Sequence, residues 1–168
     1  YEWNLIPIDD THCPRDPAME QLIERHKTVT DEKYSRYLTR FPEVYTHPRR
    51  DRETQLGKIF ADALAKTLEL AIMMVGSGSL RKTEMGPIVD YRSLCEMYPY
   101  IGKIYRIVID GKALKKMINR IFRPEVFDGI HTEFYQFSSG IKFLVNNDIR
   151  KVIDIKYNEQ PIADDQTF

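Results

Sequence analysis

The stretch Arg52-Glu53-Thr54-Gln55-Leu56-Gly57 opens a unit of the sequence that closes at Gly76-Ser77-Gly78-Ser79-Leu80-Arg81. Between these two motifs the run Leu70–Val75 is apolar throughout, which predicts a strand buried on both faces. Ahead of that strand, apolar residues recur at helical spacing and predict a helix, whose stripe comprises Leu56, Ile59, Phe60, Ala63, Leu64 and Leu68. An arginine stands at each end of this unit, so it is suited to presenting cations and backbone N–H groups to an anion.

The turn Gly76–Ser79 contains no side chain larger than serine, so a ligand can approach its backbone closely. We expect Gly76 and Gly78 to adopt positive φ, which glycine does without steric cost. Arg81 follows the turn and can contact phosphate or carboxylate in bidentate fashion. A plain strand-to-loop turn with a solvated arginine would explain the same residues. The pattern is not a Walker A loop, which requires Gly-x-x-x-x-Gly-Lys-Ser/Thr.

Composition indicates a soluble globular protein of about one domain, with 42% hydrophobic and 30% charged residues in 168. The formal net charge is zero, which argues against a polyanion-binding surface but not against a local basic pocket. The longest apolar runs are too short to span a membrane. The chain starts at Tyr1 rather than methionine, which favours a processed or excised piece. Cys13 and Cys95 are far apart and either pair or remain inert.

The segment Asp9-Asp10-Thr11-His12 has the ligand types that begin a metallophosphatase site. We reject a metal site here because the other histidines are scattered and no further ligand motif follows. A polar turn, with Asp16 capping the next helix and Pro17 in its first position, explains this region better.

We predict a helix over Ala18–Tyr37 with His26 partly buried, and a strand over Phe41–Tyr45. The basic loop His47–Arg52 either lines an anion pocket or is solvated. Further along, we predict a turn and short strand at 85–89, a brief helix Tyr91–Glu96 capped by Asp90, and a strand Ile104–Ile109.

Asp110-Gly111 is expected to start a helix whose buried face is Leu114, Met117, Ile118 and Ile121, with Lys112, Lys115 and Lys116 solvated. A loop is expected over Phe122–Thr132, and the remainder predicts strands Glu133–Phe137, Ile141–Val145 and Lys151–Tyr157, a hairpin turn at 146–148 and a polar, turn-like end from Asn158. The pattern favours an α+β fold, with a mixed β-sheet flanked by helices.

Several motifs in order resemble the C-terminal domain of the 5'-nucleotidase family, which includes UDP-sugar hydrolases and cyclic-nucleotide phosphodiesterases. They are Arg-x-Glu-Thr-x-Leu-Gly from Arg52, Ala61-Asp62-Ala63, the turn ending at Arg81, Tyr98-Pro99-Tyr100-Ile101-Gly102, Ile109-Asp110-Gly111, Gln136-Phe137-Ser138-Ser139-Gly140 and Pro161-Ile162. The resemblance covers the chain from about Tyr1 to Phe168.

The resemblance implies an inter-domain linker and helix at 1–38 and a nucleotide-binding C-terminal domain at 39–168, incomplete at its C-terminus. It implies that Arg52 and Arg81 hold phosphate or ribose, that Gly76, Ser77, Gly78 and Ser79 contact the ligand through backbone, and that Tyr100 stacks the base. The catalytic residues and two divalent metal ions would lie in a separate N-terminal metallophosphatase domain, so no catalytic or metal residue is expected here and the fragment alone is expected to be inactive. A secreted, periplasmic or cell-surface location is also implied.

Two departures from the family pattern weaken the predicted site. Family members commonly begin the glycine-rich turn with Asn, where this chain has Gly76, and a second stacking aromatic lies in a Gly-Gly-Asp-Gly-Phe/Tyr segment that this chain does not contain. The alternative is a non-catalytic nucleotide-binding or protein-interaction module. Nucleic-acid binding through His47–Arg52 is a weaker hypothesis, because the net charge is zero.

Overall fold

The computed structural model describes residues 1–168 except 1–2, 6, 124–133, 147 and 149–150. Helices α1 to α4 span Pro17–Tyr34, Gln55–Thr67, Tyr91–Met97 and Gly111–Ile121. Strands β1 to β9 span Tyr37–Arg40, Tyr45–Thr46, Met74–Gly76, Glu84–Met85, Ile88–Asp90, Tyr135–Phe137, Ile141–Asn146, Lys151–Tyr157 and Gln160–Pro161. The described part of the predicted 122–132 loop is limited to residues 122 and 123.

The α+β class is confirmed, and the strand pairs are all antiparallel among the described residues. They form four small sheets, β1-β5, β2-β4, β3-β6 and β7-β8-β9, instead of one mixed sheet. The predicted strands near the end of the chain are confirmed as β6, β7 and β8, although Glu133 lies outside the described residues. The end from Asn158 contains the short strand β9 and buried Ile162, so it is less polar than expected.

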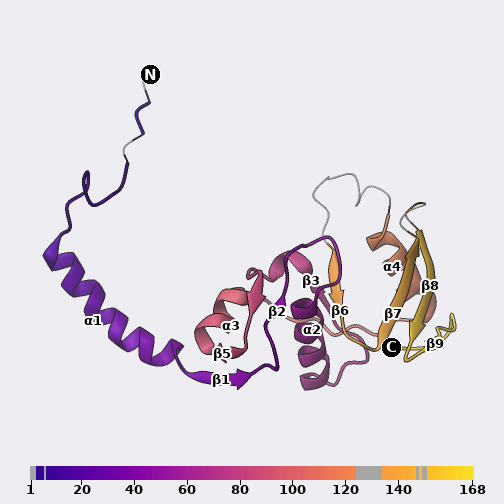
Figure 1. Ribbon diagram of the computed structural model, residues 1–168. Helices are drawn as coiled ribbons and strands as arrows, with labels where there is room; N and C mark the ends of the chain where they lie inside the picture. The colour runs from indigo at the N-terminus through magenta and orange to yellow at the C-terminus, as the bar shows by residue number, and fades with distance from the viewer. Residues whose placement is uncertain (1–2, 6, 124–133, 147, 149–150) are drawn as a thin grey trace.

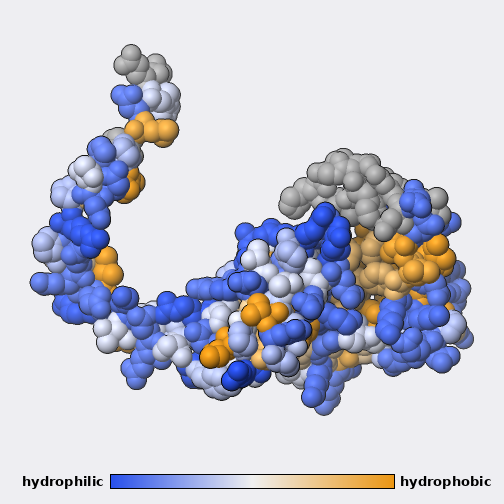
Figure 2. Space-filling view, in the orientation of Figure 1, coloured by the Kyte–Doolittle hydropathy of each residue, from blue (hydrophilic) through white to orange (hydrophobic). Residues whose placement is uncertain are grey.

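Helix α1 projects from the rest of the chain as an arm (Figure 1). Asp16 caps it through the amides of Ala18 and Met19, with Pro17 in the first turn, as predicted. The helix ends at Tyr34, three residues earlier than expected, and none of its residues is buried. His26 is therefore exposed, contrary to prediction. Figure 2 shows hydrophobic patches along this arm, where Met19, Leu22, Ile23 and Val29 are exposed.

Two separate groups of buried apolar residues hold the body together. The α2 core, defined here, packs helix α2 against the segments of β4, β5 and α3, and contains Leu56, Leu80, Met85, Val89 and Met97. The α4 core packs helix α4 against β6 to β8, and contains Leu114, Ile118, Ile121, Phe122, Phe134, Phe137, Ile141, Val152, Ile155 and Ile162. In Figure 1, β6 lies between helices α2 and α4, and it contributes Phe137 to the α4 core.

The helix faces are confirmed in part. In α4 the residues Leu114, Ile118 and Ile121 are buried as expected, whereas Lys115 bonds the carbonyl of Ile162 instead of being purely solvated. In α2 the expected stripe is wrong at Ala63 and Leu68, which are exposed, while Ala61 and Ala65 are buried. The small residues Gly57, Ala61 and Ala65 are on the buried face of α2, and at Gly57 the helix lies so close to Gln136 that a Cβ would not fit.

Three predicted strands differ from the structure. Residues 70–73 are irregular, and β3 begins only at Met74, where β6 supplies hydrogen-bonding partners. The strand predicted over Phe41–Tyr45 is wrong except at Tyr45, because β1 ends at Arg40, residues 41–44 are irregular and β2 begins at Tyr45. Ile104–Ile109 is not a strand, because only Ile109 finds a ladder partner among the described residues, in the backbone of Phe168. Strand propensity without a partner does not form a ladder.

Candidate functional site

Four buried polar side chains connect the start of α2 to the turn after β3. They are His47, Thr54, Ser77 and Gln136, each no more than 9% exposed. Burying a polar group is costly unless it is hydrogen-bonded. Each described buried side-chain nitrogen or oxygen has a partner, so this group, here called the polar network, is closed.

Gln136 lies at the centre of the polar network. Its Nε2 donates to the carbonyl oxygen of Arg52 at 2.8 Å and to Ser77 Oγ at 2.9 Å, and its Oε1 accepts from the amide of Thr54 at 3.0 Å. A flipped amide would set its NH₂ group against the Thr54 N–H, so these partners fix its orientation. One side chain of β6 thereby holds two segments that are far apart in sequence.

His47 closes the other side of the polar network. Its Nε2 lies 3.0 Å from the carbonyl oxygen of Ser77, and its Nδ1 lies 2.7 Å from Thr54 Oγ1. A carbonyl only accepts, so Nε2 carries the proton and Nδ1 accepts from the threonine hydroxyl. Burial lowers the pKa of His47, with Arg50 adding to the effect and the Ser77 carbonyl opposing it. The site therefore favours the neutral imidazole.

Thr54 is also the N-cap of α2, since its Oγ1 accepts from the amide of Gly57 at 3.2 Å. Gly57 is required by packing: a Cβ added there would lie 2.4 Å from Cδ and Oε1 of Gln136. Further along α2, Asp62 accepts hydrogen bonds from the backbone and the hydroxyl of Ser139. The segment starting at Gln136 is thus joined to α2 and its N-cap at two points, through Thr54 and through Asp62.

The turn at 76–79 is a single 3₁₀ turn over Ser77–Ser79. The expected positive φ is wrong for both glycines: φ of Gly76 is −56°, and Gly86, between β4 and β5, is the described glycine with positive φ. Ser77 is fully buried, its amide donating to the carbonyl of Phe134. The half-buried residues Gly76, Gly78 and Ser79 remain accessible to a ligand.

Both candidate arginines are exposed. Arg81 Nη1 donates to the carbonyl of Gly78 at 3.2 Å, so the guanidinium is folded back over the turn. Arg52 Nε lies 3.4 Å from Asp51 Oδ1, and Arg49 also bonds Asp51. The hydrogen bond from Arg49 lowers the pKa of Asp51. The expected basic loop therefore carries its own counter-charge, and its first residue, His47, is buried instead of solvated.

Tyr100 is about half-exposed and meets Tyr98 edge-on, with ring centroids 6.0 Å apart. Tyr98 in turn packs against Phe60 of α2, at 5.2 Å. The carbonyl of Met97, just before this loop, accepts from the amide of Arg81 at 2.8 Å. The structure therefore brings the 76–79 turn, Arg81 and the loop carrying Tyr100 together on one side of α2, with Arg52 tied to the same turn through Gln136.

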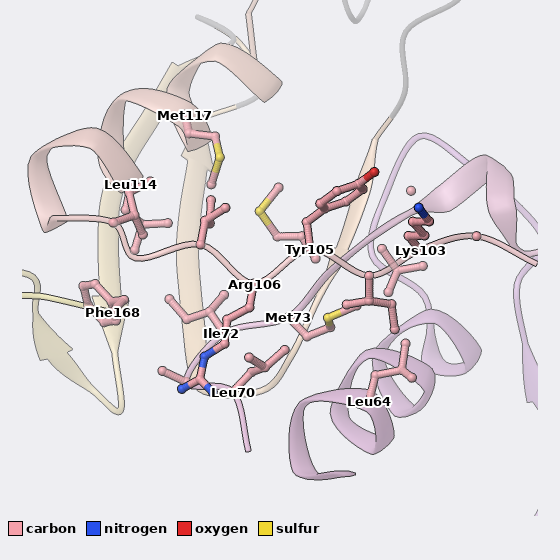
Figure 3. A pocket seen from close by; sticks show the side chains of 18 of the residues that line it. Leu64, Leu70, Ile72, Met73, Lys103, Tyr105, Arg106, Leu114, Met117 and Phe168 are labelled. Atoms are coloured by element: carbon pink, nitrogen blue, oxygen red, sulfur yellow. The ribbon is translucent and has the colours of Figure 1, made fainter. Parts of the chain in front are cut away.

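A cavity of about 650 Å³ opens between helices α2 and α4 (Figure 3). Its walls are mainly apolar, with Leu64 from α2 and Leu114 and Met117 from α4 pointing into it. Segments 69–76 and 102–109 line it as well, and so does Ser79. Gly76 and Ser79 therefore belong both to the 76–79 turn and to the cavity wall. Arg52, Arg81 and Tyr100 are not among its lining residues, so the candidate anion site is next to this cavity.

In the N-terminal segment, the two residues that suggested a metal ligand set bond each other. His12 Nδ1 and Asp9 Oδ1 lie 2.7 Å apart, and the hydrogen bond lowers the pKa of Asp9. Across the described residues no three His, Cys, Asp or Glu side chains gather as metal ligands would. Cys13 and Cys95 are both free thiols. None of the described helices is both long and apolar enough to cross a membrane.

The roles of His47 and Gln136 were not predicted from the sequence. A signal was present for Gln136, because a glutamine between two aromatic residues in a buried strand needs internal partners. His47 precedes a segment that contains three arginines, and nothing in its local sequence distinguishes it from a solvated loop residue.

Comparisons with solved structures show the same fold at low identity. The 5'-nucleotidase precursor from Thermus thermophilus superposes with a TM-score of 0.69 at 14% identity, covering 94% of this chain and 33% of that one. A putative 5'-nucleotidase from Staphylococcus aureus, solved in complex with alpha-ketoglutarate, gives 0.67 at 14%, covering 96% and 34%. The NAD nucleotidase of Haemophilus influenzae gives 0.65 at 13%, covering 93% and 31%. This chain therefore spans about a third of the length of these proteins.

Among curated protein sequences none matches this chain. Residues 29–168 match the family described as 5'-nucleotidase, C-terminal domain. That range contains α2, the polar network, the 76–79 turn and both cores. The chain belongs to the 5'-nucleotidase C-terminal domain family.

Proposed function

We propose that this chain is the substrate-recognition domain of a metal-dependent nucleotide phosphohydrolase of the 5'-nucleotidase type. Hydrolysis, and the two divalent metal ions that assist it, would belong to an N-terminal metallophosphatase domain of the same polypeptide. The observation that carries the proposal is the grouping of Arg81, the 76–79 turn and the Tyr100 loop beside α2, in a chain of this family. The chain alone is expected to bind nucleotide weakly and to hydrolyse none.

The proposed roles follow from the chemistry of each group. Arg81 is an exposed guanidinium, and Arg52 is its counterpart at the start of α2; both suit the phosphate or ribose of a nucleotide. Gly76, Gly78 and Ser79 offer an accessible backbone, and Ser77 shapes the turn from inside. Tyr100 presents a half-exposed ring on which a base can stack.

Export of the whole protein to the periplasm, the cell surface or the medium belongs to the same proposal. The relative from Thermus thermophilus is described as a precursor, which is consistent with processing of that protein. A role in nucleotide catabolism outside the cytoplasm would fit a nucleotidase of this kind.

Replacing Arg81 by alanine tests the site. In the complete protein we expect Arg81→Ala to reduce nucleotide hydrolysis at least about tenfold, because a charge-assisted contact to phosphate is lost. The thermal midpoint of this chain should stay nearly unchanged, since Arg81 is exposed and its side chain makes one hydrogen bond. The control is Arg120→Ala, which removes an exposed arginine of α4 that is not among the cavity's lining residues. Undiminished hydrolysis in Arg81→Ala would contradict the assignment.

A second candidate function is a non-catalytic nucleotide-binding or interaction module. The pairing of Arg52 with Asp51 favours it, because this arginine is already partly neutralised. The two candidates differ in one measurement: the complete protein, supplied with divalent metal, should hydrolyse nucleotides under the first and not under the second.

A further inference from the structure

The polar network joins two parts of the proposed site, Arg52 and the 76–79 turn. Its side chains do not lie on the surface that would contact a ligand. Gln136 and Ser77 are fully buried, and His47 is 3% exposed. A ligand on the surface therefore meets none of these three side chains. Their hydrogen bonds nevertheless end on the backbone of Arg52 and on the turn that precedes Arg81.

We propose that Gln136 is a positioning residue, which holds Arg52 and the 76–79 turn in the relative placement that nucleotide binding requires. The proposal rests on the proposed function, because that function makes Arg52 and the turn ligand contacts. Both Nε2 hydrogens of Gln136 are used, one on each of these two segments, at 2.8 and 2.9 Å.

The surrounding structure fixes Gln136 in turn. The amide of Thr54 donates to its Oε1. At Gly57, α2 packs so closely against the glutamine that a Cβ would not fit between them. His47 bonds both Thr54 and Ser77, so it closes the ring on the side opposite Gln136. Because α2 is capped by Thr54, a shift of Gln136 would move the first turn of α2 together with Arg52.

The chain offers a matched control for loss of a buried hydrogen bond. Ser138, two residues along the same segment, is 3% exposed, and its Oγ accepts from the amide of Met73 at 3.0 Å. Ser138→Ala removes that buried bond without touching Arg52 or the turn. Gln136→Met keeps an unbranched side chain of similar length and removes the hydrogen bonds of the amide.

Two measurements on the folded chain test the proposal. The first is the affinity for adenosine 5'-monophosphate, followed by amide chemical shifts so that weak binding is seen. Gln136→Met should weaken it about tenfold, whereas Ser138→Ala should stay within about twofold. Equal weakening by both variants, or none by Gln136→Met, would overturn the proposal.

The second measurement needs no ligand: hydrogen exchange of the Thr54 and Ser77 amides, which are bonded to Gln136 Oε1 and to the carbonyl of Phe134. In Gln136→Met both should exchange faster than in Ser138→Ala, relative to the amides of β7 and β8. Unchanged exchange at Ser77 would overturn the coupling itself. If the unmodified chain fails to bind the nucleotide while exchange at Ser77 responds, the positioning geometry stands and the proposed function is what fails.

Discussion

The α4 core is held together by apolar side chains, whereas the polar network beside the α2 core is held together by hydrogen bonds. In the α4 core, aromatic rings meet one another: Phe122 lies edge-on to Phe134, and Phe137 lies edge-on to Phe143, at 5.5 and 5.2 Å between centroids. The polar network consists of hydrogen bonds with defined directions. Apolar burial is non-directional and contributes stability, whereas hydrogen bonds contribute less net stability but fix geometry.

The two regions also differ in where they lie relative to the proposed site. The α4 core supports the wall of the cavity that carries Leu114 and Met117 (Figure 3). The polar network lies directly under the turn and the start of α2. We therefore expect changes in the α4 core to unfold the chain, and changes in the polar network to alter ligand binding and pH response first.

The largest effect is expected for Phe137→Ala in the α4 core. Phe137 is 1% exposed, and truncation of such a ring leaves a cavity that costs about 3–5 kcal/mol of unfolding free energy. Urea unfolding followed by circular dichroism measures it. The control is Ile153→Ala on β8, an exposed position, expected within about 0.5 kcal/mol. Similar losses for the two variants would show that the α4 core is not the main source of stability.

A smaller loss is expected for Gly57→Ala at the edge of the polar network. The added methyl group would meet Gln136 at 2.4 Å, and overpacking of this kind costs about 1–3 kcal/mol, which outweighs the gain in helix propensity. In a chain that already carries Gln136→Ala the space is vacant, so the same substitution should then be neutral or stabilising. A double-mutant cycle by urea unfolding measures the difference. Additive effects would contradict direct contact between the two positions.

The polar network should also make stability depend on pH. Burial lowers the pKa of His47 below its usual 6.5, so the folded chain keeps the neutral ring where the unfolded chain takes up a proton. Stability should therefore fall as the pH drops below about 6.5. Unfolding midpoints between pH 5 and 8 measure the slope, which His47→Gln should reduce. His12→Gln, at an exposed histidine, is the control. An equal reduction of the pH slope in that variant would show that His47 is not its cause.

The smallest effect on stability is expected for Tyr100→Ala, because Tyr100 lies outside both regions and is half-exposed. Its effect should fall on binding: loss of base stacking is worth about 1–3 kcal/mol. Separate titrations with adenosine 5'-monophosphate and with ribose 5-phosphate, which has no base, distinguish base stacking from contacts to the ribose and phosphate. Tyr100→Ala should weaken binding of the first and leave the second unchanged, and Tyr100→Phe should restore the first. Parallel losses for both ligands would place Tyr100 in a merely structural role.

The elements with a local cause were predictable. Asp16, Thr54, Asp90 and Asp110 cap the four helices through bonds to amides two or three residues away. The faces of α4 and the strands β7 and β8 follow from apolar periodicity over a few residues. Family membership was also predictable, because its motifs occur in order along the chain. The roles of Arg52, the 76–79 turn, Arg81 and Tyr100, and the domain boundary at residue 39, stay predictions.

What only the tertiary structure decided depends on partners distant in sequence. Ile104–Ile109 has the composition of a strand, but a ladder needs a neighbour, and only Ile109 meets one among the described residues. Gln136 meets Arg52, 84 residues away, and His47 meets Ser77, 30 residues away. Sequence by itself determines helix caps, periodic faces and motifs, because these need only nearby residues. The hydrogen-bond partner of each buried polar group depends on how the chain packs. In this chain, packing places His47 of a loop and Gln136 of a strand in the polar network beneath the candidate site.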